Sequence, residues 1–299
     1  MLYTKYIIYK NVIKNLDDKY KNNINSDSKK LFFYANAFDY LRYYRLNKFK
    51  EFDYDVYNKV SKYKKDLLLL NYIKVCQENK FYKPNITFLY GLAISYAVDL
   101  VLEKYDIKVS DYILLDKYLN KNIKLNNSYI KKHFSNSLLI SFTELDFFKE
   151  GIVRTYSTVY THTYIEESIK VLNKTFLNPF YRFKEIIISP FKNKQSRINE
   201  FSYNKNLNNK YITYFKRKIV SSESIKDEMC SIALDLISCV NQALYFDKQS
   251  DLVEFATANG WHDIIDYYSY IKKRQQEEKE RQLFYKIKQK SKIIKKRRE

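Results

Sequence analysis

Apolar residues recur at steps of three and four along much of this chain, and that spacing places them on one face of an α-helix. The clearest example is 221–245, whose apolar positions are Ile225, Met229, Ile232, Leu236, Val240 and Leu244. Weaker versions of the pattern predict helices at 2–16, 31–44, 61–80, 86–105, 136–150, 164–173 and 251–268, and a charged helical tail at 271–299. The β-branched and aromatic stretch 153–163 is typical of a short extended segment. The pattern therefore predicts an all-α protein.

The segment 86–105 combines a long apolar helix with a row of polar side chains. Ser95, Asp99 and Glu103 recur every four residues, so they lie on one face of the predicted helix. Polar groups on an otherwise apolar helix must be solvated, hydrogen-bonded or bound to a metal. The pattern by itself leaves these alternatives open.

The composition excludes several fold classes. The chain has 299 residues, 45% of them apolar, which is enough to bury a large core. Its 3 glycines, Gly91, Gly151 and Gly260, are isolated, so no GxGxxG, P-loop or GxSxG motif is present. Because tight hairpins and nucleotide-binding loops depend on glycine, β-sandwiches and doubly wound nucleotide-binding folds are not expected.

The cysteines and the apolar stretches indicate the cellular location of the protein. Cys76, Cys230 and Cys239 are scattered and have no CxxC spacing, which argues for reduced thiols inside a cell. Lysines interrupt the apolar N-terminal stretch, so it does not resemble a signal peptide. No segment reaches about 18 uninterrupted apolar residues, so no transmembrane segment is expected. We therefore expect a cytoplasmic protein.

The positive charge is concentrated at the C-terminus. The chain carries 54 Lys and Arg against 34 Asp and Glu, a net charge of +20, and residues 272–299 supply +9 of it (13 Lys and Arg minus 4 Glu). An AT-rich genome also enriches lysine, so codon bias is an alternative source of the charge. The candidate residues for binding nucleic acid or an anionic lipid surface are Lys286, Lys288, Lys290, Lys292, Lys295, Lys296, Arg297 and Arg298. So many like charges predict that 286–298 is disordered without an anionic partner.

The helix at 86–105 resembles the metal-binding helix of the zinc-dependent phospholipase C-like family, which has the form Y-x-x-G-x-x-x-H-Y-x-x-D-x-x-x-H-P-Y. Aligned without a gap, the matching residues are Gly91, Tyr96, Asp99 and Tyr105. The two histidines of the motif fall on Ser95 and Glu103, and its proline falls on Lys104.

Three further segments resemble the same family in the same order. Lys5, in Thr4-Lys5-Tyr6, stands where the family's first helix has a histidine. Asp39 is kept in a segment whose family counterpart is a turn with glycine and proline. Glu144 and Asp146 match the last two acids of an acidic helix motif, while Phe142 replaces the first. The resemblance spans about residues 4–250, and it implies an all-helical, phospholipase C-like fold.

The departures from the family decide which chemistry the resemblance implies. A catalytic zinc ion typically needs three protein ligands, and every family histidine that can be placed is replaced here. The remaining candidate metal ligands are Asp39, Asp99, Glu103 and Glu144, an all-oxygen set that suits a divalent metal such as Mg²⁺ or Ca²⁺ better than zinc. Alternatively, Lys5 neutralises two of these acids as a buried ion pair, and no cofactor is bound. We favour the ion pair. The histidines elsewhere, His133, His162 and His262, are not paired at helical spacing.

These observations predict one helical domain at 1–250, followed by a C-terminal helix and basic tail at 251–299. The expected function is that of a non-catalytic scaffold or binding protein, a pseudoenzyme that engages an anionic partner through Lys and Arg. Two alternatives stay open: a divergent metal-dependent phospholipase or phosphoesterase, and a basic component of a nucleoprotein assembly such as a ribosome or virion.

Overall fold

The structure is a computed structural model of the full chain. It describes residues 2–22, 24, 28–43, 57, 60, 64–78, 86–107, 115, 142–156, 164–170, 211–215 and 218–296. All statements below concern these residues.

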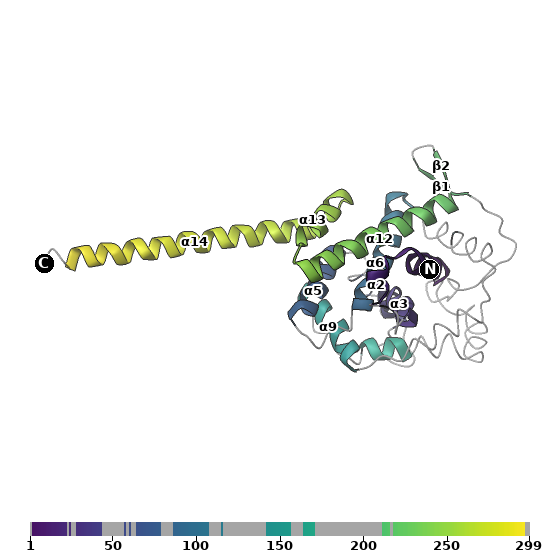
Figure 1. The fold of residues 1–299 in the computed structure, drawn as a ribbon, viewed down its shortest axis with the longest axis horizontal. Helices are drawn as coiled ribbons and strands as arrows, with labels where there is room; N and C mark the ends of the chain where they lie inside the picture. Colours follow the sequence, from purple (N-terminus) through teal and green to yellow (C-terminus); the bar gives the residue numbers. More distant parts are fainter. Residues whose placement is uncertain are drawn as a thin grey trace, which may run out of the picture.

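The described residues are mainly α-helical, which confirms the predicted all-α class (Figure 1). The helices are α1 (Leu2–Asn15), α2 (Asp18–Lys21), α3 (Ser28–Tyr34), the 3₁₀ helix η1 (Ala37–Tyr43), α5 (Lys65–Glu78), α6 (Ile86–Lys104), α9 (Phe142–Tyr156), a helix at 164–170, α12 (Ser222–Phe246), α13 (Gln249–Ala258) and α14 (Asp263–Lys296). The strands β1 (Tyr211–Phe215) and β2 (Lys218–Ser221) form an antiparallel hairpin in which Phe215 pairs with Lys218.

Helix α6 is the centre of the body. Every residue from Thr87 to Val98 is buried, and α12, α3, α1 and α5 pack around the helix. Gly91 lets α6 approach the end of α3 closely: a Cβ atom at this position would lie 2.7 Å from the carbonyl carbon of Tyr34 and 2.8 Å from the backbone nitrogen of Ala35. A continuous apolar run therefore forms a helix that is buried on nearly all sides.

Aromatic rings join α6 to α5 and α9. The ring of Phe88 lies 4.9 Å from that of Tyr72 and 5.2 Å from that of Phe147, measured between centroids. The Tyr72 hydroxyl donates a hydrogen bond to the carbonyl oxygen of Phe148 at 2.6 Å. A side chain at Gly151 would overlap the Tyr72 ring, so glycine is needed where α9 crosses it.

The expectation of an extended segment at 153–163 is wrong for 153–156, which form the last turn of α9; residues 157–163 lie outside the described part of the chain. Tertiary contacts outweigh the β propensity of Val153 and Thr155 here. The Thr155 hydroxyl donates to the carbonyl oxygen of Gly151 within the helix, and it accepts a hydrogen bond from Asn71 of α5. The helical conformation thus satisfies this buried hydroxyl.

Residues beyond 250 contribute to the same core as the preceding helices. Leu252 and Ala256 of α13, Trp261 and Ile264 are all buried, and the Trp261 ring packs edge-on against Tyr96 of α6 with 5.8 Å between centroids. The exposed part of the C-terminal extension begins at Lys272, and from there to Tyr285 every residue is exposed. The globular body therefore includes the first two turns of α14.

Helix α14 is continuous from Asp263 to Lys296, so the predicted basic helical extension is confirmed. The expectation that 286–298 is disordered alone is wrong for 286–296, which continue the helix; 297–299 lie outside the described residues. Lys, Gln, Arg and Glu are good helix formers, and pairs of opposite charge at i, i+4 further stabilise a solvated helix.

Two described helices, α6 and α12, are long and apolar enough to cross a membrane by length and composition. In α6, 78% of the most apolar window is buried inside the protein, and in α12 the share is 44%. Burial of this extent in α6 is the pattern of a core helix.

Candidate functional site on α6

The polar row Ser95, Asp99 and Glu103 lies along one face of α6, as its spacing predicts, and lysines from two other helices contact it. Lys5 comes from α1 and Lys65 from the start of α5. We call these five residues together with Asp39 the lysine–carboxylate row.

Lys5 occupies the end of the row nearest Ser95. Its Nζ atom donates to Asp39 Oδ2 at 2.7 Å and to Ser95 Oγ at 3.0 Å. The Lys5 side chain is 4% exposed and that of Asp39 26% exposed, so the charges meet at the edge of the core. This geometry confirms the predicted ion pair between Lys5 and Asp39. The expectation that Lys5 neutralises two of the acids is wrong, because its second contact is Ser95 and Asp99 is paired with Lys65. Lys5 stands where the resemblance places a metal-binding histidine.

Lys65 occupies the other end of the row. Its Nζ atom lies 2.7 Å from Glu103 Oε1 and 3.2 Å from Asp99 Oδ2, and its side chain is 9% exposed. Burial alone would lower the pKa of Lys65, but the charges of Asp99 and Glu103 outweigh that effect and raise the pKa above its ordinary value. Lys65 is therefore held firmly in its charged form.

Sequence reasoning missed Lys65, because nothing distinguishes it from the neighbouring lysines at 62 and 64. Lys64 is exposed and has a left-handed backbone with φ of 54°, whereas Lys65 begins α5 and points inward. The direction of the first helical turn decides which of the two enters the core. A buried lysine opposite a pair of acids can only be recognised once α5 and α6 are packed.

Glu144, the fourth candidate metal ligand, lies in a separate cluster with two residues of α3. Lys30 Nζ donates to its Oε1 atom at 2.7 Å, and the Tyr34 hydroxyl donates to the same oxygen. The carboxylate is thus neutralised and hydrogen-bonded from one side. This cluster joins α3 to α9.

A lysine ammonium contacts each of the four candidate acids. Among the described residues, no three His, Cys, Asp or Glu side chains are grouped so that they could hold a metal ion. In each of these ion pairs the ammonium group contacts one carboxylate oxygen, and its positive charge would repel a cation that approached the same carboxylate. The arrangement is well suited to fixing helix positions.

The remaining predicted residues lie elsewhere. His262 is exposed between α13 and α14, whereas His133 and His162 lie outside the described residues. The basic candidates from Lys286 to Lys296 lie on the last turns of α14, where the structure describes the backbone alone. Arg297 and Arg298 lie outside the described residues. The structure therefore separates the carboxylates on α6 from the basic end of the chain.

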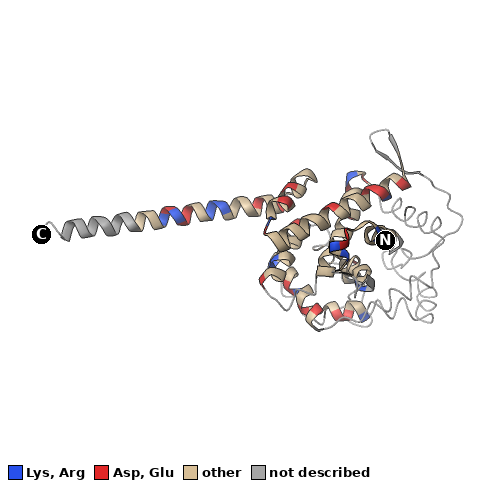
Figure 2. Ribbon diagram, in the orientation of Figure 1, with Lys and Arg blue, Asp and Glu red and all other residues tan. Residues whose placement is uncertain are grey.

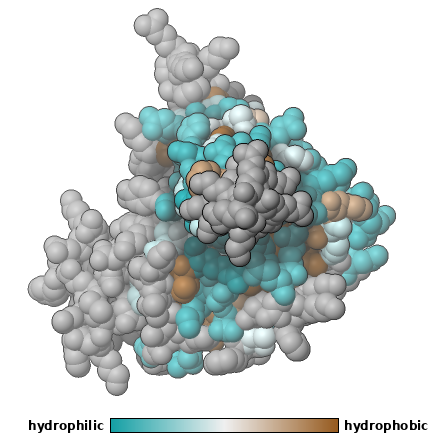
Figure 3. Space-filling view, turned by 90° about the vertical axis from the view of Figure 1, so that its left-hand side faces the viewer, coloured by the Kyte–Doolittle hydropathy of each residue, from teal (hydrophilic) through white to brown (hydrophobic). Residues whose placement is uncertain are grey.

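Helix α14 forms a second, distinct feature of the molecule. It extends away from the body as one helix, and blue and red residues mark the charges on the part of it that is coloured (Figure 2). The face from which it projects is mainly hydrophilic among the described residues (Figure 3). The exposed basic residues on the described surface of this helix are Lys272, Lys273, Arg274, Lys279 and Arg281.

The chain matches no family model, no curated protein and no solved structure. The resemblance to the zinc-dependent phospholipase C-like family accordingly stays a prediction based on motif order and spacing.

Proposed function

We propose that this protein is a non-catalytic binding protein that engages a nucleic acid through helix α14. The observation that carries the proposal is the form of this helix: it projects from the body, is exposed on all sides over residues 272–285, and leads into the most basic stretch of the chain. A field of this sign attracts polyanions, and the phosphate backbone is the partner that such a helix can contact along its whole length.

Side-chain contacts hold the first turns of α14 against α5. This supports the proposal, because a helix held in this way keeps its exposed charged residues at a defined position relative to the body. The Asp66 carboxylate accepts a hydrogen bond from the backbone N–H of Ile264 at 2.8 Å. Lys74 donates to the Tyr267 hydroxyl at 2.7 Å and lies 4.3 Å from the centroid of its ring. These contacts fix the direction in which the helix leaves the body.

The pattern of the exposed helix favours a nucleic acid over a lipid bilayer. A membrane-surface helix needs an apolar face along its length. Residues 272–282 contain no apolar side chain, so three turns of α14 are polar on every side. Leu283, Phe284 and Tyr285 are consecutive and spread over a wide arc of the helix. An apolar stripe at helical spacing, Leu283, Ile287 and Ile294, begins only after these polar turns, so binding to lipid vesicles is included in the test below.

The lysine–carboxylate row supports the non-catalytic part of the proposal. Lys5 contacts Asp39, and Lys65 contacts Asp99 and Glu103, so a lysine lies beside each of these acids. In the proposed scaffold, ion pairs hold the helices together where the family resembled in sequence uses a metal. Such a protein keeps the helical fold but does not catalyse the metal-dependent hydrolysis.

The test is the salt dependence of binding to a single-stranded oligonucleotide. The full chain is compared with K290Q/K292Q/K295Q/K296Q and with a control that loses the same charge on the body, K10Q/K14Q/K104Q/K170Q. Each lost phosphate contact lowers the slope of log affinity against log salt by about 0.7 for single strands, so we expect the tail variant to lose up to about 3 in slope.

The slope of log affinity against log salt should change little in the control variant, because its four lysines lie outside the proposed binding helix. Equal losses in the two variants would contradict the proposal, because the binding charge would then be spread over the body. Binding to vesicles of anionic phospholipid without binding to the oligonucleotide would also contradict it, and would instead assign α14 to a membrane surface.

A further inference from the structure

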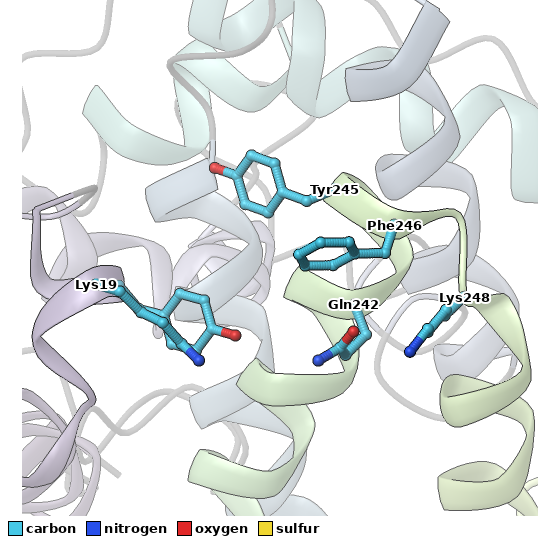
Figure 4. A pocket seen from close by; sticks show the side chains of 6 residues that line it. Lys19, Gln242, Tyr245, Phe246 and Lys248 are labelled. Atoms are coloured by element: carbon cyan, nitrogen blue, oxygen red, sulfur yellow. The ribbon is translucent and has the colours of Figure 1, made fainter.

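An open hollow of about 630 Å³ lies between α2 and the end of α12 (Figure 4). Its volume falls within the range of small-ligand sites. The lining consists of aromatic rings, lysines and one amide: Lys19, Tyr20, Gln242, Tyr245, Phe246 and Lys248. None of these lining residues, all from the described part of the chain, is acidic.

The aromatic rings of this hollow are unusually exposed. Phe246 is 65% exposed and Tyr245 is 51% exposed. In the described part of the chain, they are the exposed large apolar side chains outside α14. Exposing so much apolar surface forgoes the stabilisation that burial would contribute, so these rings are candidates for contacting a partner.

Local backbone structure explains why these rings stay outside the core. The buried stripe of α12 includes Val240 and Ala243, whereas Tyr245 and Phe246 follow it on the other side of the last turn. The helix then ends at Asp247, which has a left-handed backbone with φ of 53°, and the Lys248 N–H donates to the Gln242 carbonyl oxygen. This cap holds Lys248 beside the rings.

The lysines border the rings from two different elements. In the view of Figure 4, the Phe246 ring and the Gln242 side chain lie between the ends of Lys19 and Lys248. Lys19 Nζ lies 4.6 Å from the centroid of the Tyr20 ring and 3.2 Å from Asp17 Oδ2. Its hydrogen bond with Asp17 raises the pKa of Lys19, so the side chain is cationic at neutral pH. An incoming anion would compete with Asp17, whose side chain is itself exposed.

We propose that this hollow binds one nucleotide of a single-stranded nucleic acid, with the base stacked on Phe246 and Tyr245 and the adjacent phosphates contacted by Lys19 and Lys248. Aromatic rings that alternate with cationic side chains are the general means of binding single strands. The Gln242 amide offers both a donor and an acceptor to the edge of a base. A base in a duplex is stacked between its neighbours and could not reach the rings, so the site selects single strands.

This inference rests on the proposed function, because it names the form of nucleic acid that the protein engages. It adds a contact on the body, whereas the proposed function concerns α14. The two can therefore fail independently.

The first test compares F246A with F246Y in the full chain. Phe246 is 65% exposed, and F246Y keeps an aromatic ring at this position, whereas F246A removes it. Binding of a fluorescent oligothymidylate of about 10 nucleotides is measured by anisotropy. A stacked base contributes about 1–3 kcal/mol, so F246A should weaken binding by about 5- to 150-fold without changing the salt slope, whereas F246Y should weaken it less than threefold.

The second test uses K19Q/K248Q against K10Q/K14Q. The first pair should lower the salt slope by about 1.4, and the control should not. The inference is overturned if F246A binds the oligonucleotide as tightly as the full chain while the tail variant loses affinity. It is also overturned if duplex binds as well as single strand with the same loss in F246A, or if only an acidic peptide competes for the site.

Discussion

The ammonium group of Lys5 in α1 lies 2.7 Å from the carboxylate of Asp39 in η1, and it also donates to Ser95 of α6. One buried side chain thus joins three helical elements at the edge of the core. Removing it would break this ion pair at a carboxylate that is only 26% exposed. The consequence can be measured as a loss of stability.

Lys5→Ala should lower the free energy of unfolding by about 2–4 kcal/mol, because it removes the contacts of Lys5 with Asp39 and Ser95 and leaves a cavity. The value lies near the lower end for buried pairs because Asp39 is partly solvated. Urea denaturation provides the measurement. Lys10→Ala, an exposed position on the same helix, should cost less than about 0.5 kcal/mol. A change that small for Lys5→Ala would show that the pair contributes nothing.

Lys65→Met should destabilise the protein by about 2–4 kcal/mol, since it leaves Asp99 and Glu103 facing each other without a cation. Adding Asp99→Asn should restore part of the loss, because one of the stranded charges is removed. The raised pKa of Lys65 means that its stabilisation is present in full below the ordinary lysine pKa and is lost as pH rises through the folded-state value.

The dependence of stability on pH tests whether the stabilisation by Lys65 is lost at alkaline pH. The stability difference between the full chain and Lys65→Met should be constant near neutral pH and shrink above about pH 10.5. Lys64→Met, at the exposed neighbouring position, provides the control and should cost less than about 0.5 kcal/mol at neutral pH. A difference that grows with alkaline pH would contradict the ion pair.

Asp66→Asn tests the anchor of α14. Burial raises the pKa of Asp66, although the N–H groups of Ile264 and Leu67 act in the opposite direction. The folded protein then binds a proton more tightly than the unfolded chain does. The stability that this provides is present in full below about pH 3.8 and is lost as pH rises through the folded-state pKa.

Asp66→Asn removes the titrating carboxyl group, so the pH-dependent part of the stability that comes from Asp66 should be lost in this variant. The measurement is the difference in unfolding free energy between the two proteins from about pH 3.5 to 7, which should change within that range and then level off. A difference for Asp66→Asn that is flat over this range would contradict a buried, hydrogen-bonded carboxylate.

Gly91→Ala should destabilise the protein by about 1–3 kcal/mol, because the added methyl group would overlap the backbone at the end of α3. Alanine is intrinsically better than glycine in a helix by about 1 kcal/mol, so a helix that was free at this face would gain stability instead. Thermal unfolding distinguishes the two signs. A rise in melting temperature would contradict the close approach of α6 to α3.

Metal analysis of the purified protein tests the replacement of a metal by lysines. We expect less than one zinc ion per chain and no phospholipase activity. If the purified protein retained one or more tightly bound zinc ions, and Asp99→Asn released them, the proposal that lysines neutralise these carboxylates in place of a metal would be contradicted.

Several helices that the hydrophobic pattern predicted are found in the structure, because a three-to-four-residue repeat is a local property. The bounds of others differ: the helix predicted at 251–268 is divided between α13 and α14, and the one predicted at 136–150 is described as α9 at 142–156. Residues 86–105 became α6, and 221–245 became α12. The predicted helix at 31–44 is divided into α3 and η1, however. The Asn36 side chain donates to the carbonyl oxygen of Phe32, and its own carbonyl accepts from Asp39, so the chain turns there.

The pairing of Lys5 could be predicted because motif order placed it beside the acids, whereas that of Lys65 and Lys30 could not. A lysine in a chain with 54 Lys and Arg carries no sign of its partner, and the choice depends on which helix faces which. The hollow beside Phe246 was missed for the same reason. Its lining comes from residues 19–20 and 242–248, which the sequence gives no reason to join.

By itself, the sequence determined the helical class, the buried character of α6, the polar row on its face and the basic character of the C-terminal extension. These properties follow from composition and from periodicity within single helices. Only the tertiary structure decided that lysines neutralise every candidate metal ligand, that Asp66 anchors α14, and that the rings at the end of α12 stay exposed. Those properties depend on contacts between residues far apart in sequence, and such contacts are set by how the helices pack, which no local pattern encodes.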